Sequence, residues 1–144
     1  MSEQGPAPYH LPFGQAQVPA ARPWQVTVAA LIGFGLSGLC VLLSVAVLTI
    51  DDGSGISEQL TGSPDASGAV VFAGLLSAAM YLVPAVFVLQ RKGWARVMMI
   101  VVAGVGIAGG LLSLPGGILG AAVHGLLLVT MLQHPTREWF GARR

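Results

Sequence analysis

His124 is the residue of this sequence with the clearest capacity for chemistry. It lies deep within a long apolar stretch, where an ionisable side chain is costly and indicates a functional site by default. Cys40 and Tyr81 lie deep in other apolar stretches, but a thiol and a phenol are ordinarily neutral near pH 7. Because histidine commonly titrates in the physiological range, His124 is the side chain to which a proton or ligand response would be assigned.

Two serines lie at a similar depth. Counted from the outer ends of their apolar stretches at 1.5 Å per residue, His124 lies ~10 Å deep, Ser77 ~12 Å and Ser44 ~9 Å. The three side chains belong to three different stretches. We therefore predict a hydrogen-bonded cluster of Ser44, Ser77 and His124.

The turn near residues 115–116 sets the neighbours of His124. In an antiparallel helix pair about this turn, His124 lies opposite Ile107, in the middle of the glycines between Gly104 and Gly110. The imidazole should therefore lie beside bare backbone.

Three interpretations of the polar cluster follow. A neutral imidazole bonded to a serine is an interhelical contact that contributes about 1 kcal/mol in a membrane. A proton- or ligand-responsive site is the second interpretation. A nucleophilic Ser–His pair is disfavoured, because no acidic residue to orient the histidine and no recognisable serine elbow accompany it. With one cysteine and no metal-ligand spacing, the sequence predicts no catalytic residue, no cofactor and no metal site.

Four apolar stretches must position these residues. Each is about long enough to cross a hydrocarbon core of about 30 Å. We therefore predict an all-α membrane protein, a bundle of four transmembrane helices within residues 24–134. The predicted spans are about 24–50, 69–89, 95–114 and 116–132.

The composition indicates the same class. Hydrophobic residues make up 54% of the 144 residues and charged residues 9%, whereas soluble domains carry about 25% charged residues. The formal net charge is +1, and the basic residues are spread over short segments, which argues against nucleic acid as a partner.

The segments outside the spans differ in character. Residues 1–23 are rich in proline and show no hydrophobic period, which predicts a disordered cytoplasmic tail. Residues 51–68 carry acidic residues, glycine and serine but no Lys or Arg, which predicts a flexible external loop. Residues 135–144 should form a short basic cytoplasmic tail after Pro135 ends the fourth helix.

Charge and aromatic residues predict one orientation. All seven Lys and Arg residues fall on one side of the predicted spans, which should be the cytoplasmic side, so both termini are predicted to be cytoplasmic. The three tryptophans fall at the same boundary. The predicted anchors at this inner interface are Trp24, Trp94, Trp139, Arg91, Lys92, Arg96 and Arg137.

Small residues at helical spacing predict where the helices pack. Lipid tails do not drive apolar helices together, so association depends on close approach of small side chains. One pair forms a GxxxG motif in the third stretch. The predicted packing residues are Gly33, Ser37, Gly74, Gly106, Gly110, Gly117, Ala121 and Gly125.

Short motifs at the helix ends carry a resemblance. They are residues 22–28 leading into the first span, residues 93–96 opening the third, and Pro135 to Phe140, which close with Trp139-Phe140. In this layout the chain resembles uncharacterised small four-span membrane proteins of the actinobacterial type. The resemblance implies a topology and no known activity. The chain differs from small multidrug exporters, because those need a carboxylate within the first span and this one has none.

Three classes of function compete. A non-enzymatic accessory, scaffold or partner-binding component of the plasma membrane needs only helix faces lined by small residues, a tail, and anchoring residues at the inner membrane interface. A small oligomeric transporter or pore, including a holin-like variant, needs a hydrophilic path through the bundle. An intramembrane enzyme is disfavoured. We therefore expect a non-enzymatic component in contact with the bilayer, with a membrane-protein partner or a second copy of the chain.

Overall fold

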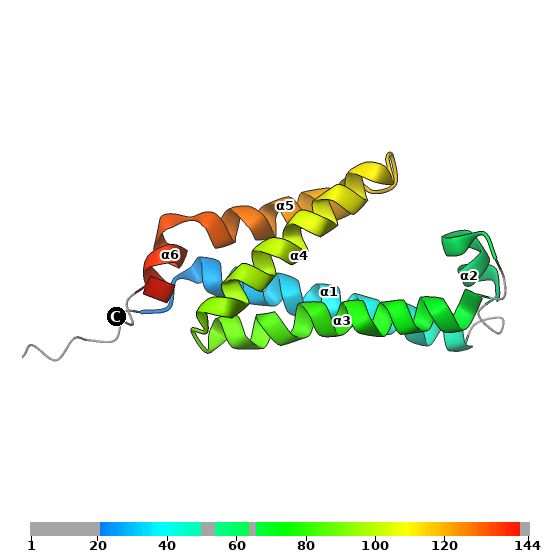
Figure 1. The fold of residues 1–144 in the computed structure, drawn as a ribbon, viewed down its shortest axis with the longest axis horizontal. Helices are drawn as coiled ribbons and strands as arrows, with labels where there is room; N and C mark the ends of the chain where they lie inside the picture. The colour runs from blue at the N-terminus through cyan, green and yellow to red at the C-terminus, as the bar shows by residue number, and fades with distance from the viewer. Residues whose placement is uncertain (1–20, 50–53, 64–65, 142–144) are drawn as a thin grey trace, which may run out of the picture.

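The computed structural model describes residues 21–49, 54–63 and 66–141, and these residues form helices joined by short connections (Figure 1). The predicted all-α fold is confirmed for this part of the chain. The predicted tail over 1–23 lies outside the described residues, apart from its last three positions. The helices are α1 (Trp24–Thr49), α2 (Ser54–Thr61), α3 (Ser67–Leu89), α4 (Gly93–Leu112), α5 (Ile118–Leu132) and α6 (His134–Gly141).

The long helices form two antiparallel pairs. The most extensive contacts join α1 to α3 and α4 to α5. The pairs meet at the end where α3 turns into α4, and they diverge toward the tip of the α4–α5 hairpin, as Figure 1 shows. The molecule is therefore splayed, with the two pairs closed at one end and open at the other.

The buried core lies at the closed end. It combines the first turns of α1 and α4 with the last turns of α3 and α5. Small side chains alternate there with large ones, so that the four helices approach closely. The core residues are Val26, Ala29, Ala85, Val88, Ala95, Met99, Ala103, Leu127 and Met131.

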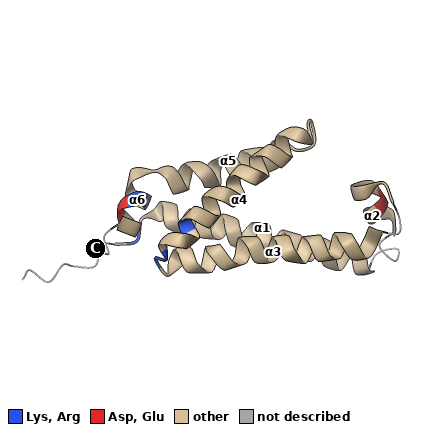
Figure 2. Ribbon diagram, viewed as in Figure 1, with Lys and Arg blue, Asp and Glu red and all other residues tan. Residues whose placement is uncertain are grey.

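The described basic residues lie at this same closed end, which we call the basic end (Figure 2). The acidic Glu58 lies at the opposite end, on α2, whereas Glu138 lies on α6. Segregation of Lys and Arg to one end of an apolar bundle is the pattern that the positive-inside rule describes.

Within the described part of the chain, three helices are long and apolar enough to cross a membrane: α1, α3 and α4. The pair α5 and α6 makes a fourth candidate only if the two are counted as one span, because they meet at an angle of 54°. The chain is thus compatible with a multi-pass membrane protein of three to four spans.

Pro135 ends one helix and begins another. The sequence predicted a short tail after Pro135, but the structure forms α6 there, with Pro135 in its first turn. Proline is favoured at this position, because its missing N–H would have no helical partner anyway. The Thr136 hydroxyl donates to the Thr130 carbonyl at 2.8 Å, which satisfies an acceptor at the end of α5.

The loop predicted over 51–68 also contains a helix. Within its described part, α2 covers Ser54–Thr61 and ends at Gly62, which has a φ of +75°. The Gly62 N–H donates to the Glu58 carbonyl at 2.7 Å. A left-handed glycine that satisfies the last carbonyls is the usual helix stop, and this local signal was missed in the sequence.

Most of the small residues predicted to pack are in close contact. A Cβ on Gly33 would lie 2.8 Å from the Ala85 Cβ, and one on Gly110 would lie 2.8 Å from the Ala121 nitrogen. Gly117 faces the backbone of Gly110, Gly74 faces the Ser44 hydroxyl, and Ser37 is buried.

Gly125 differs from these residues. A Cβ there would meet nothing within 4 Å, whereas the neighbouring His124 ring contacts α4 at Gly106.

Candidate functional site

His124 on α5 and Tyr81 on α3 form a polar pair between helices. The Tyr81 Oη lies 2.8 Å from the His124 Nε2, and the ring centroids are 5.8 Å apart. The His124 Nδ1 lies 2.7 Å from the Gly120 carbonyl oxygen, one turn back on α5. A carbonyl only accepts, so in the neutral imidazole Nδ1 carries the hydrogen and Nε2 accepts one from Tyr81.

Gly106 provides the space for this pair. A Cβ on Gly106 would overlap the imidazole ring of His124. The ring therefore lies against the bare backbone of α4, one residue from the register position that the turn at 115–116 indicated. With both ring nitrogens bonded and the side chain 7% exposed, the imidazole has one defined orientation.

The predicted hydrogen bonds between His124 and the serines were wrong. His124 bonds to Tyr81, and the Ser44 hydroxyl donates to the Cys40 carbonyl of its own helix at 2.9 Å. The prediction grouped the three residues by their depth in the membrane alone. Which side chains meet also depends on their rotation around the helix axis and on their length. Tyr81 lies one turn after Ser77 on α3, and its longer side chain spans the gap to α5.

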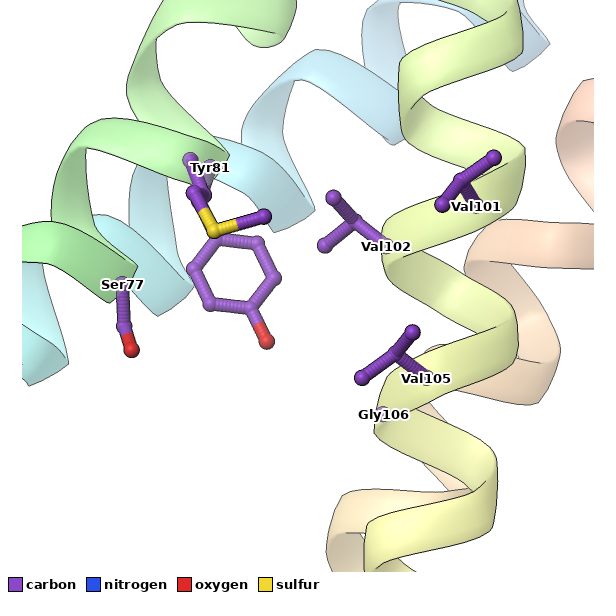
Figure 3. Close-up of a pocket in the computed structure, with 7 residues that line it drawn as sticks. Ser77, Tyr81, Val101, Val102, Val105 and Gly106 are labelled. Carbon is purple, nitrogen blue, oxygen red and sulfur yellow. The ribbon is translucent and has the colours of Figure 1, made fainter. Parts of the chain in front are cut away.

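Ser77 and Ser44 instead line hollows beside the pair. One hollow, of about 140 Å³, lies between α3 and α4, and Ser77, Tyr81 and Gly106 are part of its lining (Figure 3). A second, of about 200 Å³, lies between α1 and α3, and its lining includes Ser44, Gly74 and Ser77. Ser77 is thus the residue that the two hollows share.

Tyr81 is the member of this polar pair that sequence reasoning missed. It was noted as an ionisable group within a span, but it was given no partner. The signal that could have found it is its i, i+4 relation to Ser77, which places both side chains on one face of α3.

The predicted anchors at the basic end are also held by specific contacts. The Arg91 guanidinium lies over the Trp139 ring, 4.4 Å from its centroid, and its Nε donates to the Trp139 carbonyl. The Arg96 Nε donates at 3.0 Å to the Met131 carbonyl, one of the last acceptors of α5. A cation at a helix C-terminus also interacts favourably with the partial negative charge that the helix dipole places there.

The tryptophans differ in exposure. Trp24 is exposed, and Trp94 is partly exposed while it packs on Phe87 with ring centroids 4.9 Å apart. Trp139 is partly buried, with its ring under Arg91. Trp24 and Trp94 are therefore available to an interface, whereas Trp139 also holds α6 onto the bundle.

Metal chemistry has no support among the described residues. No group of three or more His, Cys, Asp or Glu side chains there could hold a metal ion. The described site is one polar pair, Tyr81 and His124, with the two hollows next to it.

Comparisons with known proteins add no assignment. No protein-family model matches the chain, and neither a curated protein nor a solved structure matches it. The resemblance to small actinobacterial membrane proteins stays a prediction, and function has to be argued from the geometry of the helices.

Proposed function

We propose that this chain is a non-enzymatic component of the plasma membrane that binds another membrane protein. In this proposal it crosses the bilayer four times, with α5 and α6 together as the fourth span and both termini in the cytoplasm. The segregation of Lys and Arg to the basic end supports this orientation.

The splayed arrangement of the helix pairs is the observation that carries the proposal. The pairs are held together at the basic end and separate toward the other, so the first turns of α3 lie away from the α4–α5 hairpin. The hollow on α1 and α3, whose lining includes Ala73, Gly74 and Ser77, begins in these first turns. Small residues let a further helix approach closely, and a serine can hydrogen-bond across the contact.

Affinity purification from the native membrane tests the proposal. The tagged full chain, extracted in mild detergent, should recover a membrane protein in stoichiometric amount by mass spectrometry. Ala73→Phe fills the hollow between α1 and α3 and should reduce this recovery. Ala79→Phe is the matched control, since Ala79 is exposed on α3 and is not part of that lining. Equal recovery by the two variants, or no partner at all, would contradict the proposal.

A small oligomeric transporter or pore is the second candidate, favoured by one observation. Ser44, Ser77 and the Tyr81 hydroxyl lie along adjoining hollows, so polar groups follow one another over part of the bundle's length. The pure chain would then form a homo-oligomer and release a small dye from liposomes, and Ser77→Val would slow that release. Intact liposomes would exclude this candidate.

A further inference from the structure

The hollow between α3 and α4 has the properties of a ligand site. Its walls are Met80 and Tyr81 on one side and three valines on the other, Val101, Val102 and Val105. Figure 3 shows the Tyr81 ring lying between the two helices, with Ser77 and Val105 on either side of its hydroxyl. One face is open, because the side chains of Met80, Val101 and Val105 are exposed.

The polar end of this hollow offers an acceptor. With the imidazole neutral, the Nδ1 hydrogen is donated to the Gly120 carbonyl, so Nε2 accepts the Tyr81 hydrogen. Two lone pairs remain on the Tyr81 Oη, and a hydrogen-bond donor can approach them from the hollow. Within a hydrocarbon layer little water is present to supply one.

The apolar walls favour an aromatic ring. The hollow measures about 140 Å³, and an engineered apolar cavity of about 150 Å³ is enough to hold benzene. The Tyr81 ring offers an aromatic contact, and the Met80 sulfur offers a sulfur–aromatic one. A saturated ring or an alkyl chain would gain neither contact.

We propose that this hollow binds a hydroxylated aromatic ring, a phenol or the hydroquinone head group of a lipid. The ring lies among the valines, Met80 and the Tyr81 ring, and its O–H donates to the Tyr81 Oη. The ligand enters sideways from the bilayer through the exposed side of the hollow. This inference does not depend on the proposed partner-binding function, because the hollow lies on α3 and α4 and not on α1.

Fluorine NMR with 4-fluorophenol as the probe tests the site. The full chain is placed in phosphatidylcholine nanodiscs, and saturable binding is separated from partition into lipid by titration. We expect saturable binding by the native chain and none by Val105→Phe or Val101→Phe, which fill the hollow from side chains that are already exposed. Val97→Phe is the matched control, because Val97 is exposed on the same helix and does not line the hollow.

The hydroxyl and the ring are tested separately. Tyr81→Phe should weaken the binding of 4-fluorophenol about tenfold, because one hydrogen bond of about 1.4 kcal/mol is lost. Fluorobenzene, which lacks the hydroxyl, and cyclohexanol, which lacks the aromatic ring, should each compete less well than phenol. If both hollow-filling variants bind like the native chain, or if fluorobenzene binds as tightly as 4-fluorophenol, the proposal is overturned.

Competition also identifies the source of the ring. 4-Dodecylphenol and 4-methylphenol are compared at equal concentration in the membrane. Stronger displacement by the tailed compound assigns the site to a lipid head group, and equal displacement assigns it to a free phenol. Displacement by neither would contradict the site, whatever the outcome of the partner purification.

Discussion

Gly106 and His124 act as one unit at the scale of single residues. The missing side chain on α4 provides the space that the imidazole on α5 fills, and the two ring nitrogens are then held by Tyr81 and Gly120. A buried polar group in a membrane is stable only when its hydrogen bonds are made, so the contact and the hydrogen bonds depend on one another.

The glycine is tested by adding one methyl group. Gly106→Ala places a Cβ that overlaps atoms of the imidazole ring, so either the ring or α4 has to move. Overpacking of this kind costs about 1–3 kcal/mol, and the free energy of unfolding in detergent should fall by that amount. Gly104→Ala is the control, because a Cβ there meets nothing within 4 Å. A fall of equal size in both variants would contradict the assigned contact.

The hydrogen bond between Tyr81 and His124 is tested by a double-mutant cycle. Tyr81→Phe and His124→Phe each remove one partner, and the double variant removes both. We expect a coupling of about 0.6 kcal/mol in the free energy of unfolding, the average for polar contacts between membrane helices, and no more than about 1.7 kcal/mol. Additive effects of the two substitutions would show that the side chains do not interact.

At the scale of elements, the turn between α3 and α4 contributes to the docking of α6 through Arg91. Arg91 has a φ of +61°, a left-handed conformation that costs a non-glycine residue roughly 1 kcal/mol. The Lys92 N–H donates to the Phe87 carbonyl and the Arg91 N–H to the Val88 carbonyl, which is the usual glycine-type helix stop. Arginine at this position places its guanidinium over Trp139, which glycine could not do.

Substitution of Arg91 separates these two roles. Arg91→Gly should keep the end of α3 and weaken the docking of α6, because it removes a cation–π contact of about 0.5–2 kcal/mol and also the hydrogen bond to the Trp139 carbonyl. The measurement is acrylamide quenching of Trp139 fluorescence, in a background with Trp24→Phe and Trp94→Phe. We expect quenching to rise in Arg91→Gly and to stay unchanged in Lys92→Ala. Unchanged quenching in Arg91→Gly would mean that α6 is held by other contacts.

At the scale of the whole molecule, the sequence predicted the long helices well and their ends less well. Apolar length alone located α1, α3 and α4, because a helix in a membrane satisfies its backbone within itself. Pro135 was taken as a stop, although proline in a first turn also favours a helix start, and so α6 was missed. Counting residues from the turn at 115–116 located His124 beside the glycines of α4. The same counting could not find Tyr81, since depth carries no information about rotation around a helix axis.

The orientation of the whole chain is tested by cysteine labelling. In a Cys40→Ala background, Ser63→Cys marks the end that carries α2, and Gln90→Cys marks the basic end. A membrane-impermeant maleimide on intact cells should label Ser63→Cys at once and Gln90→Cys only after permeabilisation. The reverse pattern would show that the basic end faces outward.

The unequal lengths of the two helix pairs have a consequence for the lipid around them. α1 has 26 residues and would measure about 39 Å, whereas α5 has 15 and would measure about 22 Å, less than a hydrocarbon core of about 30 Å. Leu112, Leu114 and Leu119 are exposed around the short hairpin tip, so the surface around this tip suits contact with acyl chains. For the tip to reach the membrane surface, the leaflet around it would have to thin on the α5 side and stay thick beside α1. Such one-sided hydrophobic mismatch costs fractions of a kcal/mol per Å, and it favours thin membranes or neighbours that share the deformation.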